Sequence, residues 1–118
     1  MNAPVERPDF SIITAVRNAK STIVDCMRSI DAQRSVRVQH IIIDACSSDG
    51  TSELIEKQGR IDRIHVREGD RGISDAWNKG LKLCTGRYIG ILSADDYYSA
   101  DTLAKARSAL DKDPRRMC

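Results

Sequence analysis

Apolar and polar positions follow two different periods along the chain, and these periods divide it into alternating strands and helices. Apolar runs at residues 9–16, 38–44 and 88–92 have the length and composition typical of buried strands. Residues 63–67 alternate between polar and apolar side chains, which predicts a short strand near the edge of a sheet. The chain therefore offers four strands, each separated from the next by a helical pattern.

Apolar residues spaced three and four positions apart predict the helices. The first begins near Ser21 or Thr22, either of which can cap it. A second spans residues 52–58 and stops at Gly59, and a last helix spans residues 101–110. The predicted inner stripes are Ile23, Cys26, Met27 and Ile30 in the first helix, Leu54 and Ile55 in the second, Ile73, Ala76, Trp77, Gly80, Leu81 and Cys84 in the third, and Leu103, Ala106 and Leu110 in the last.

This alternation predicts an α/β fold, a Rossmann-like and mostly parallel sheet with helices on both faces. Right-handed crossovers place every strand exit at the same edge of such a sheet. With 118 residues the chain has room for one domain. We assign that domain to residues 9–118 and expect residues 1–8, a tail that contains prolines, to be mobile.

Composition narrows the classes of partner and the cellular location. A formal net charge of +2, from scattered Lys and Arg residues, gives no indication of nucleic-acid binding. No apolar stretch is long enough to span a bilayer, and the N-terminus lacks the apolar segment of a signal peptide. The 4 cysteines are widely spaced without a Cys-x-x-Cys pair, so neither zinc nor a disulfide framework is expected. A reducing cytosol is the predicted location.

Three predicted loops meet at the carboxyl edge of the sheet, at residues 14–18, 44–51 and 93–98, where open α/β folds bind their ligands. Asp95 and Asp96 are adjacent carboxylates at the exit of the last strand. Two like charges there are unfavourable unless a cation holds them, and a hard divalent ion with oxygen ligands fits best. A solvated turn is the alternative interpretation.

Asp44 ends the second strand, where its carboxylate can accept a hydrogen bond from a ring N–H; its alternative role is to cap the following turn. Asp49 and Gly50 are a weak signal by themselves because many loops carry this pair. The Gly-x-Gly-x-x-Gly fingerprint and the Gly-x-x-x-x-Gly-Lys-Ser/Thr phosphate loop are both absent. If the chain binds a nucleotide, it does so in neither of those two ways.

Four motifs carry a family resemblance, in the order SIITAVRN at residues 11–18, IDACSSDGT at 43–51, DRGISDAWNKG at 70–80 and SADD at 93–96. In this order and at these spacings the chain resembles the family 2 glycosyltransferases, which are inverting nucleotide-sugar transferases with the GT-A fold. The resemblance extends over nearly the whole chain. It implies a glycosyltransferase that moves a sugar from a nucleotide diphosphate, most often UDP, to a glycan or lipid-linked acceptor.

The resemblance also implies roles for individual residues. The nucleoside pocket would be lined by Thr14, Ala15, Val16, Arg17 and Asn18. Asp44 would hold the base, usually uracil, and Asp49 would support that pocket from the neighbouring turn. Asp75 would border the diphosphate and sugar, although a carboxylate in the first turn of a helix also suits the helix dipole. Asp95 would approach the ribose or sugar, and Asp96 would ligate Mg²⁺ or Mn²⁺ on the diphosphate.

Two departures from the family pattern modify these expectations. Arg17 stands where an aromatic residue is common, and arginine can stack on a ring or contact a phosphate. Relatives continue well beyond the metal-binding element, where a downstream carboxylate serves as the catalytic base. We therefore expect this chain to be the donor-binding half of a transferase, apparently truncated, with no catalytic residue of its own before Cys118.

The same reasoning predicts how the chain associates and which other functions compete. Without the later strands that the resemblance implies, the apolar strand at residues 88–92 would have an uncovered edge, which predicts self-association into a homo-oligomer. A lipid-linked acceptor would place the protein at the inner face of the membrane as a peripheral protein.

One alternative is a non-catalytic domain that binds a nucleotide or a partner chain. A second is a receiver-like signalling domain that binds Mg²⁺, although its acid pair would follow the first strand.

Overall fold

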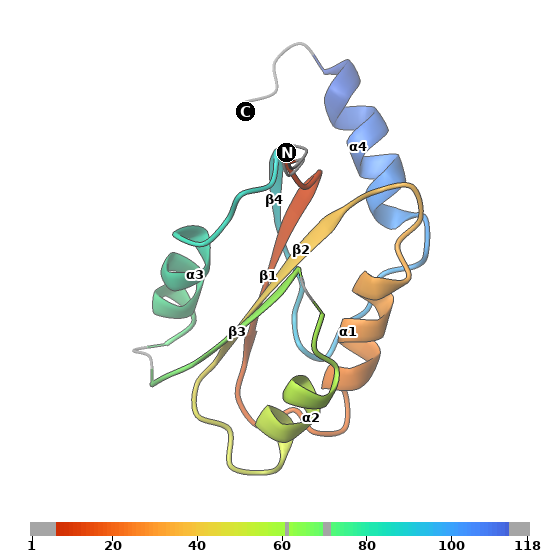
Figure 1. The fold of residues 1–118 in the computed structure, drawn as a ribbon. Helices are drawn as coiled ribbons and strands as arrows, with labels where there is room; N and C mark the ends of the chain where they lie inside the picture. The colour runs from red at the N-terminus through yellow and green to blue at the C-terminus, as the bar shows by residue number, and fades with distance from the viewer. Residues whose placement is uncertain (1–6, 61, 70–71, 114–118) are drawn as a thin grey trace, which may run out of the picture.

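The apolar runs pair into a 4-stranded sheet in the order β3-β2-β1-β4, and every pairing is parallel (Figure 1). The computed structural model describes residues 7–60, 62–69 and 72–113. The strands are β1 (Phe10–Val16), β2 (Val38–Asp44), β3 (Arg63–Arg67) and β4 (Tyr88–Ile91). Their bounds agree with the sequence pattern to within a residue, and the alternation of strands and helices is confirmed.

Helices cover both faces of the sheet, as predicted. They are α1 (Ile23–Asp31), α2 (Thr51–Lys57), α3 (Ile73–Leu81) and α4 (Thr102–Lys112). Figure 1 shows α3 on one side of the sheet and α1, α2 and α4 on the other. Among the residues described, no helix has both the length and the apolar character needed to cross a membrane.

The core is split by the sheet into two clusters because successive strand residues point to opposite faces. Ile12 of β1 joins the larger cluster beneath α1, α2 and α4, whereas Ile13 joins the smaller cluster beneath α3. The inner stripe predicted for α1 is confirmed, since Ile23, Cys26, Met27 and Ile30 are all buried. Strand β2 is buried along its whole length, as a strand flanked on both sides should be.

Helix α3 packs closely on β1 because Gly80 has no side chain. A Cβ at this position would lie only 2.6 Å from Cγ2 of Ile13, too close for any other residue to fit without movement. The prediction that Leu81 belongs to the inner stripe is wrong, since this side chain is 47% exposed. With the backbone at Gly80 resting on Ile13, the next position lies at the side of the helix. The side chain of Ile73 lies outside the described part of the chain.

The sequence predicts that strand β4 is buried, and this is wrong for one of its faces. Ile89 and Ile91 are 51% and 50% exposed. The register pairs Ile91 with Ile13, so both isoleucines project on the side of α3, which covers β1 and β2 but not β4. Residues 1–6 of the expected mobile tail lie outside the described residues, whereas Arg7 and Pro8 are hydrogen-bonded to Thr85 and Arg87 respectively.

Candidate functional site

A cleft of about 410 Å³ opens at the carboxyl edge of the sheet, between the loops that follow β1 and β4. Its lining includes Ala15, Val16, Arg17 and Asn18 on one side and Ser93, Ala94 and Asp95 on the other. These two segments are far apart in the sequence, but β1 and β4 are parallel neighbours, so their exits lie side by side. The structure thus brings together five of the residues singled out in the sequence.

Thr14 does not reach this cleft. Its side chain is fully buried on the α1 face, and its hydroxyl lies 2.8 Å from Nε2 of His40. Burial lowers the pKa of His40 to about 3, so the ring is neutral and serves the hydroxyl as a structural partner. Burial also raises the pKa of the nearby Cys26 thiol to about 11. Strand alternation explains the outcome, because position 14 points to the core.

Asn18 and Arg17 form the exposed end of the β1 loop. Asn18 has a φ of 54°, in the left-handed region that asparagine tolerates better than most residues. Its backbone N–H donates to Oγ of Ser47 at 2.9 Å, and its side-chain oxygen accepts from the N–H of Ser48 at 2.8 Å. The loop after β1 is therefore fastened to the loop after β2, which leaves Arg17 exposed in the cleft.

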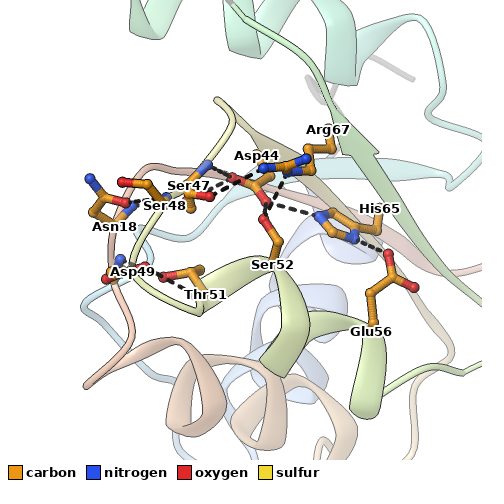
Figure 2. A network of polar contacts seen from close by, with 11 residues as sticks. Asn18, Asp44, Ser47, Ser48, Asp49, Thr51, Ser52, Glu56, His65 and Arg67 are labelled. Atoms are coloured by element: carbon orange, nitrogen blue, oxygen red, sulfur yellow. Dashed lines mark hydrogen bonds and ion pairs between the residues drawn. The ribbon is translucent and has the colours of Figure 1, made fainter.

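Asp44 lies at the centre of a hydrogen-bond network rather than in the cleft lining (Figure 2). One carboxylate oxygen accepts from the N–H of Ser47 at 3.0 Å and from its hydroxyl at 2.7 Å. The other oxygen accepts from the Ser52 hydroxyl and lies 3.1 Å from Nε2 of His65. Burial alone would raise the pKa of Asp44, but these bonds, from Ser52 first, hold it below its usual value.

A carboxylate offers about four lone-pair positions, and all of those of Asp44 are used inside the protein. The side chain is also fully buried. The geometry therefore supports the alternative role that the sequence left open, that of capping the turn after β2. A direct contact between Asp44 and a base stays a prediction.

Asp49 organises the next turn and joins it to the β1 loop. Its carboxylate accepts from the N–H of Thr51 at 3.0 Å and from the N–H of Lys20 at 3.2 Å. The Thr51 hydroxyl also donates to it, and these bonds, from Thr51 first, lower the pKa of Asp49. Asp49 thus lies in the turn neighbouring the cleft, where the resemblance implied a supporting residue.

Sequence reasoning missed His65, which links Asp44 to helix α2. Its Nδ1 lies 2.8 Å from Oε1 of Glu56, and its Nε2 faces Asp44 (Figure 2). The signal was present in the alternation of residues 63–67, because Arg63, His65 and Arg67 must share one face of the strand. That face lies beside the end of β2, since the register pairs Asp44 with Arg67.

Asp95 and Asp96 are exposed at the exit of β4. Asp95 accepts a hydrogen bond from the Ser93 hydroxyl at 2.6 Å, whereas no side-chain partner of Asp96 is found within the described ranges. Over those same ranges, no three residues among His, Cys, Asp and Glu are grouped as a ready-made metal site. The pair nevertheless fits Mg²⁺ or Mn²⁺, because such ions often take one or two carboxylates together with phosphate oxygens of a ligand.

Asp75 is not among the residues that line the cleft. Its carboxylate lies 3.3 Å from Nζ of Lys79, one turn along α3, and the same ammonium lies 3.2 Å from Glu68. An acid in the first turn followed by a lysine four residues later stabilises a helix without any ligand. Residues 70–71, which open this motif in the sequence, lie outside the described part of the chain.

Comparison with known proteins supports the resemblance. The family described as "Glycosyl transferase family 2" matches residues 11–118. The chain is 38% identical to the putative teichuronic acid biosynthesis glycosyltransferase TuaG of Bacillus subtilis, over 84% of this chain and 40% of that protein. It is 33% identical to the succinoglycan biosynthesis protein ExoO of Rhizobium meliloti, over 89% of this chain and 31% of that protein. The chain thus spans well under half of these relatives.

Solved structures share the fold. The mannosyltransferase PcManGT of Pyrobaculum calidifontis, in complex with GDP-Man and Mn²⁺, superposes with a TM-score of 0.82 at 29% identity, over 92% of this chain and 34% of that one. S. aureus TarS residues 1–349, in complex with UDP-GlcNAc, superposes with a TM-score of 0.81 at 24% identity, over 88% of this chain and 31% of that one. The expected GT-A type of α/β fold is confirmed, and a receiver-like domain is set aside. By the extent of the family match, this chain belongs to glycosyl transferase family 2.

Proposed function

We propose that this chain is the donor-binding part of a glycosyltransferase that transfers a sugar from a nucleotide diphosphate, a UDP-sugar, to a glycan or lipid-linked acceptor. The observation that carries the proposal is the cleft between the loops after β1 and β4, with the exposed Arg17 on one wall and the exposed carboxylate of Asp95 on the other. Membership of the family supports sugar transfer. The donors bound by PcManGT and TarS support a nucleotide-diphosphate sugar, and the UDP-GlcNAc bound by TarS supports UDP.

In this proposal the two walls of the cleft have different tasks. Arg17 is exposed, so its guanidinium can stack on the base or contact a phosphate of the donor. The fixed backbone at residues 15–18 forms the surface against which the nucleoside lies. Asp95, on the opposite wall, accepts hydrogen bonds from the ribose or sugar hydroxyls. The nucleoside is thus held by the β1 loop, and the sugar lies toward the β4 loop.

Asp96, with Asp95 beside it, would hold Mg²⁺ or Mn²⁺. When bound, the ion acts as a Lewis acid that neutralises the charge developing on the diphosphate leaving group. The chain's own contribution is to keep two carboxylates exposed, with one side-chain hydrogen bond among the described residues, from Ser93 to Asp95. Carboxylates left in this state repel each other, and binding a cation relieves that repulsion.

Donor binding can be tested by calorimetry with UDP, with GDP and with inorganic diphosphate, each with and without Mn²⁺. We expect UDP to bind more tightly than GDP, and metal to strengthen the binding of all three diphosphates. Equal affinities for UDP and GDP would contradict the choice of UDP. Affinities that do not depend on Mn²⁺ would contradict the assignment of Asp96 as a metal ligand. Failure of every nucleotide to bind would overturn the proposal.

A second function, nucleotide binding without sugar transfer, is favoured by one observation. Asp95 is the one carboxylate among the described residues that line the cleft, and it already has a proposed role at the sugar. A general base within hydrogen-bond reach of the acceptor oxygen is therefore not assigned. An assay for UDP release and glycosylated product, run with several UDP-sugars and acceptors, separates the two functions. We further propose a cytoplasmic location, peripheral to the membrane if the acceptor is lipid-linked.

A further inference from the structure

His65 is held between two carboxylates that come from different elements. Its Nε2 lies 3.1 Å from Asp44 at the end of β2, and its Nδ1 lies 2.8 Å from Glu56 of α2. The His65 side chain is 11% exposed, Asp44 is fully buried and Glu56 is 72% exposed. Both contacts have hydrogen-bond length, so each must have a proton between its two heavy atoms.

Proton counting determines the state of the ring in this arrangement. A neutral imidazole has one N–H donor and one acceptor nitrogen, whereas an ionised carboxylate only accepts. If Nε2 donates to Asp44, then a neutral Nδ1 would point a lone pair at Glu56 across 2.8 Å, which is repulsive. Both contacts are hydrogen bonds only when both ring nitrogens carry a proton. With a single ring proton, one of the two contacts is lost as a hydrogen bond.

The charged groups around the ring are consistent with the doubly protonated state. Asp44 and Glu56 bring two negative charges to the two ring nitrogens. Arg67 and Arg63 flank His65 on the same face of β3, but each is engaged elsewhere. Arg67 donates to the Ser52 hydroxyl at 3.1 Å and to the carbonyl of Ser47 at 3.4 Å, and Arg63 is paired with Asp31 of α1.

A continuous chain of hydrogen bonds leads from His65 to the cleft. Asp44, which contacts the ring, accepts two bonds from Ser47. The Ser47 hydroxyl accepts from the backbone N–H of Asn18, which lines the cleft in a left-handed conformation. We infer that His65, in its imidazolium form, is a positioning residue of the donor site: it fixes Asp44 and, through Ser47, the backbone of the β1 loop. This inference rests on the proposed function, because it assigns His65 to the donor site.

Loss of the second proton should loosen the network without unfolding the chain. The ring then repels Glu56 and turns, which weakens the bond to Asp44 and lets the loop around Asn18 relax. Imidazole groups change charge between roughly pH 5 and 8. The affinity for the donor should therefore fall when the ring loses its second proton. Donor affinity thus reports whether the ring carries its second proton.

Two substitutions separate this role from a merely structural one. In Glu56→Gln, the amide N–H₂ can donate to an unprotonated Nδ1, so the contact survives with a neutral ring. In His65→Leu, the ring and both bonds are lost. Glu53→Gln is the matched control, because Glu53 is an exposed acid on the same helix and does not contact His65.

The experiment measures the affinity for a UDP-sugar with Mn²⁺ by calorimetry at several pH values between roughly 5.5 and 8. A UDP-sugar is used because its diphosphate, unlike that of UDP, has no terminal phosphate group that titrates in this range. We expect the affinity of the unmodified chain to fall by about tenfold, the scale of one bond to a charged group. Glu56→Gln should keep the low-pH affinity throughout, His65→Leu should be weak throughout, and Glu53→Gln should behave like the unmodified chain. A Glu56→Gln profile that matches the unmodified chain would overturn the inference.

A readout without ligand distinguishes failure of this inference from failure of the proposed function. The backbone amide signals of Ser47 and Asn18 report the two bonds that carry the coupling. In NMR titrations of the free chain they should shift with pH in the unmodified protein and in Glu53→Gln, but not in Glu56→Gln. If no UDP-sugar binds at any pH while these signals behave as expected, the proposed function fails and the network stands. If the amide signals of Ser47 and Asn18 do not shift with pH in the unmodified protein, the proposed network is wrong.

Discussion

Strands β2 and β4 have similar sequence patterns, but β2 is buried in the fold and β4 is partly exposed. Each is a short apolar run that leads into acidic residues, Asp44 in one case and Asp95 with Asp96 in the other. Strand β2 is flanked by β1 and β3 and is buried along its whole length. Strand β4 is an edge strand, with Ile89 and Ile91 half-exposed and both acids in contact with solvent.

This contrast in burial determines which acid is available to a ligand. The carboxylate of Asp44 is surrounded by four donors from the protein and has no lone pair to spare. Asp95 has a single hydrogen bond, from Ser93, and within the described residues Asp96 has none from a side chain. A buried and fully bonded acid organises the loops, whereas an exposed and sparsely bonded acid can bind a metal or a sugar.

The largest effect is expected from Asp44→Ala. The substitution leaves the donors of Ser47 and Ser52 buried without an acceptor, and each such group costs about 1–3 kcal/mol. We expect the free energy of unfolding to fall by about 3 kcal/mol or more in denaturant titrations. Asp49→Ala, at an exposed position in the same loop, should cost less.

The same variant tests how Asp44 serves the donor. If it acts by holding the loops, Asp44→Ala should weaken UDP and inorganic diphosphate by a similar factor. A loss confined to UDP would show that Asp44 contacts the base directly and would contradict the structural role. Calorimetry with the two ligands decides between these roles.

We expect acid to lower the free energy of unfolding because His40 of β2 is buried in its neutral form. The pKa of its buried ring is lowered from 6.5 to about 3, so the unfolded chain takes up a proton before the folded chain does. Stability should therefore decrease as the pH falls below 6.5, by up to about 1.4 kcal/mol per pH unit. Between pH 6.5 and 5 this amounts to about 2 kcal/mol.

The control for this effect is His40→Gln, which keeps an amide donor for Thr14 but does not titrate. Urea unfolding of both proteins at the two pH values isolates the contribution of the ring from that of the carboxylates. The variant should lose clearly less stability on acidification. Equal losses in the two proteins would mean that His40 is not the group responsible.

On the β4 side, Asp96→Asn should change binding and leave the fold intact. An exposed carboxylate that has no side-chain partner within the described part of the chain adds little to stability, so the change in unfolding free energy should stay within about 0.5 kcal/mol. The metal-dependent part of the UDP affinity should disappear, a loss of at least about tenfold, or about 1.4 kcal/mol. Asp101→Asn, at another exposed aspartate, is the control. Metal-dependent binding that survives in Asp96→Asn would remove Asp96 from the site.

The sequence predicts the elements well because their periods are local properties. It also predicts that the loops after β1 and β4 meet, since a parallel sheet with right-handed crossovers leaves little choice. The family resemblance predicts an uncovered edge at β4, but the run itself does not predict the exposure of Ile89 and Ile91, because their burial depends on strand order and on which strands α3 covers. The same limit explains Thr14, whose proximity to the strand exit suggested the cleft although its face of the strand is the core.

Long-range hydrogen bonds are the other part that sequence reasoning could not supply. The contacts of His65 with Asp44 and Glu56 join residues 21 and 9 positions apart, and they depend on the register between β2 and β3. A histidine in an alternating strand is unremarkable until that register is known. The motifs marked Asp44 as important, but its surroundings decide whether it binds a ligand or holds a loop.

A small change in stability is also expected at the exposed apolar face of β4. Ile89 and Ile91 project beside α3 without cover from it, so replacing both with threonine removes apolar surface while keeping a β-branched residue suited to a strand. The unfolding free energy of a dilute sample should change by no more than about 0.5 kcal/mol per site.

We propose that the chain self-associates through this face and edge, because an unpaired apolar edge strand can pair with that of another copy. Sedimentation velocity at increasing protein concentration should then show association in the unmodified chain and less of it in the double variant. Tyr97→Thr is the control, since Tyr97 is 74% exposed, lies in the loop beyond β4 and should not alter association. If the double variant associates as strongly as the unmodified chain, the edge of β4 is not the contact surface, and its exposed isoleucines have no part in assembly.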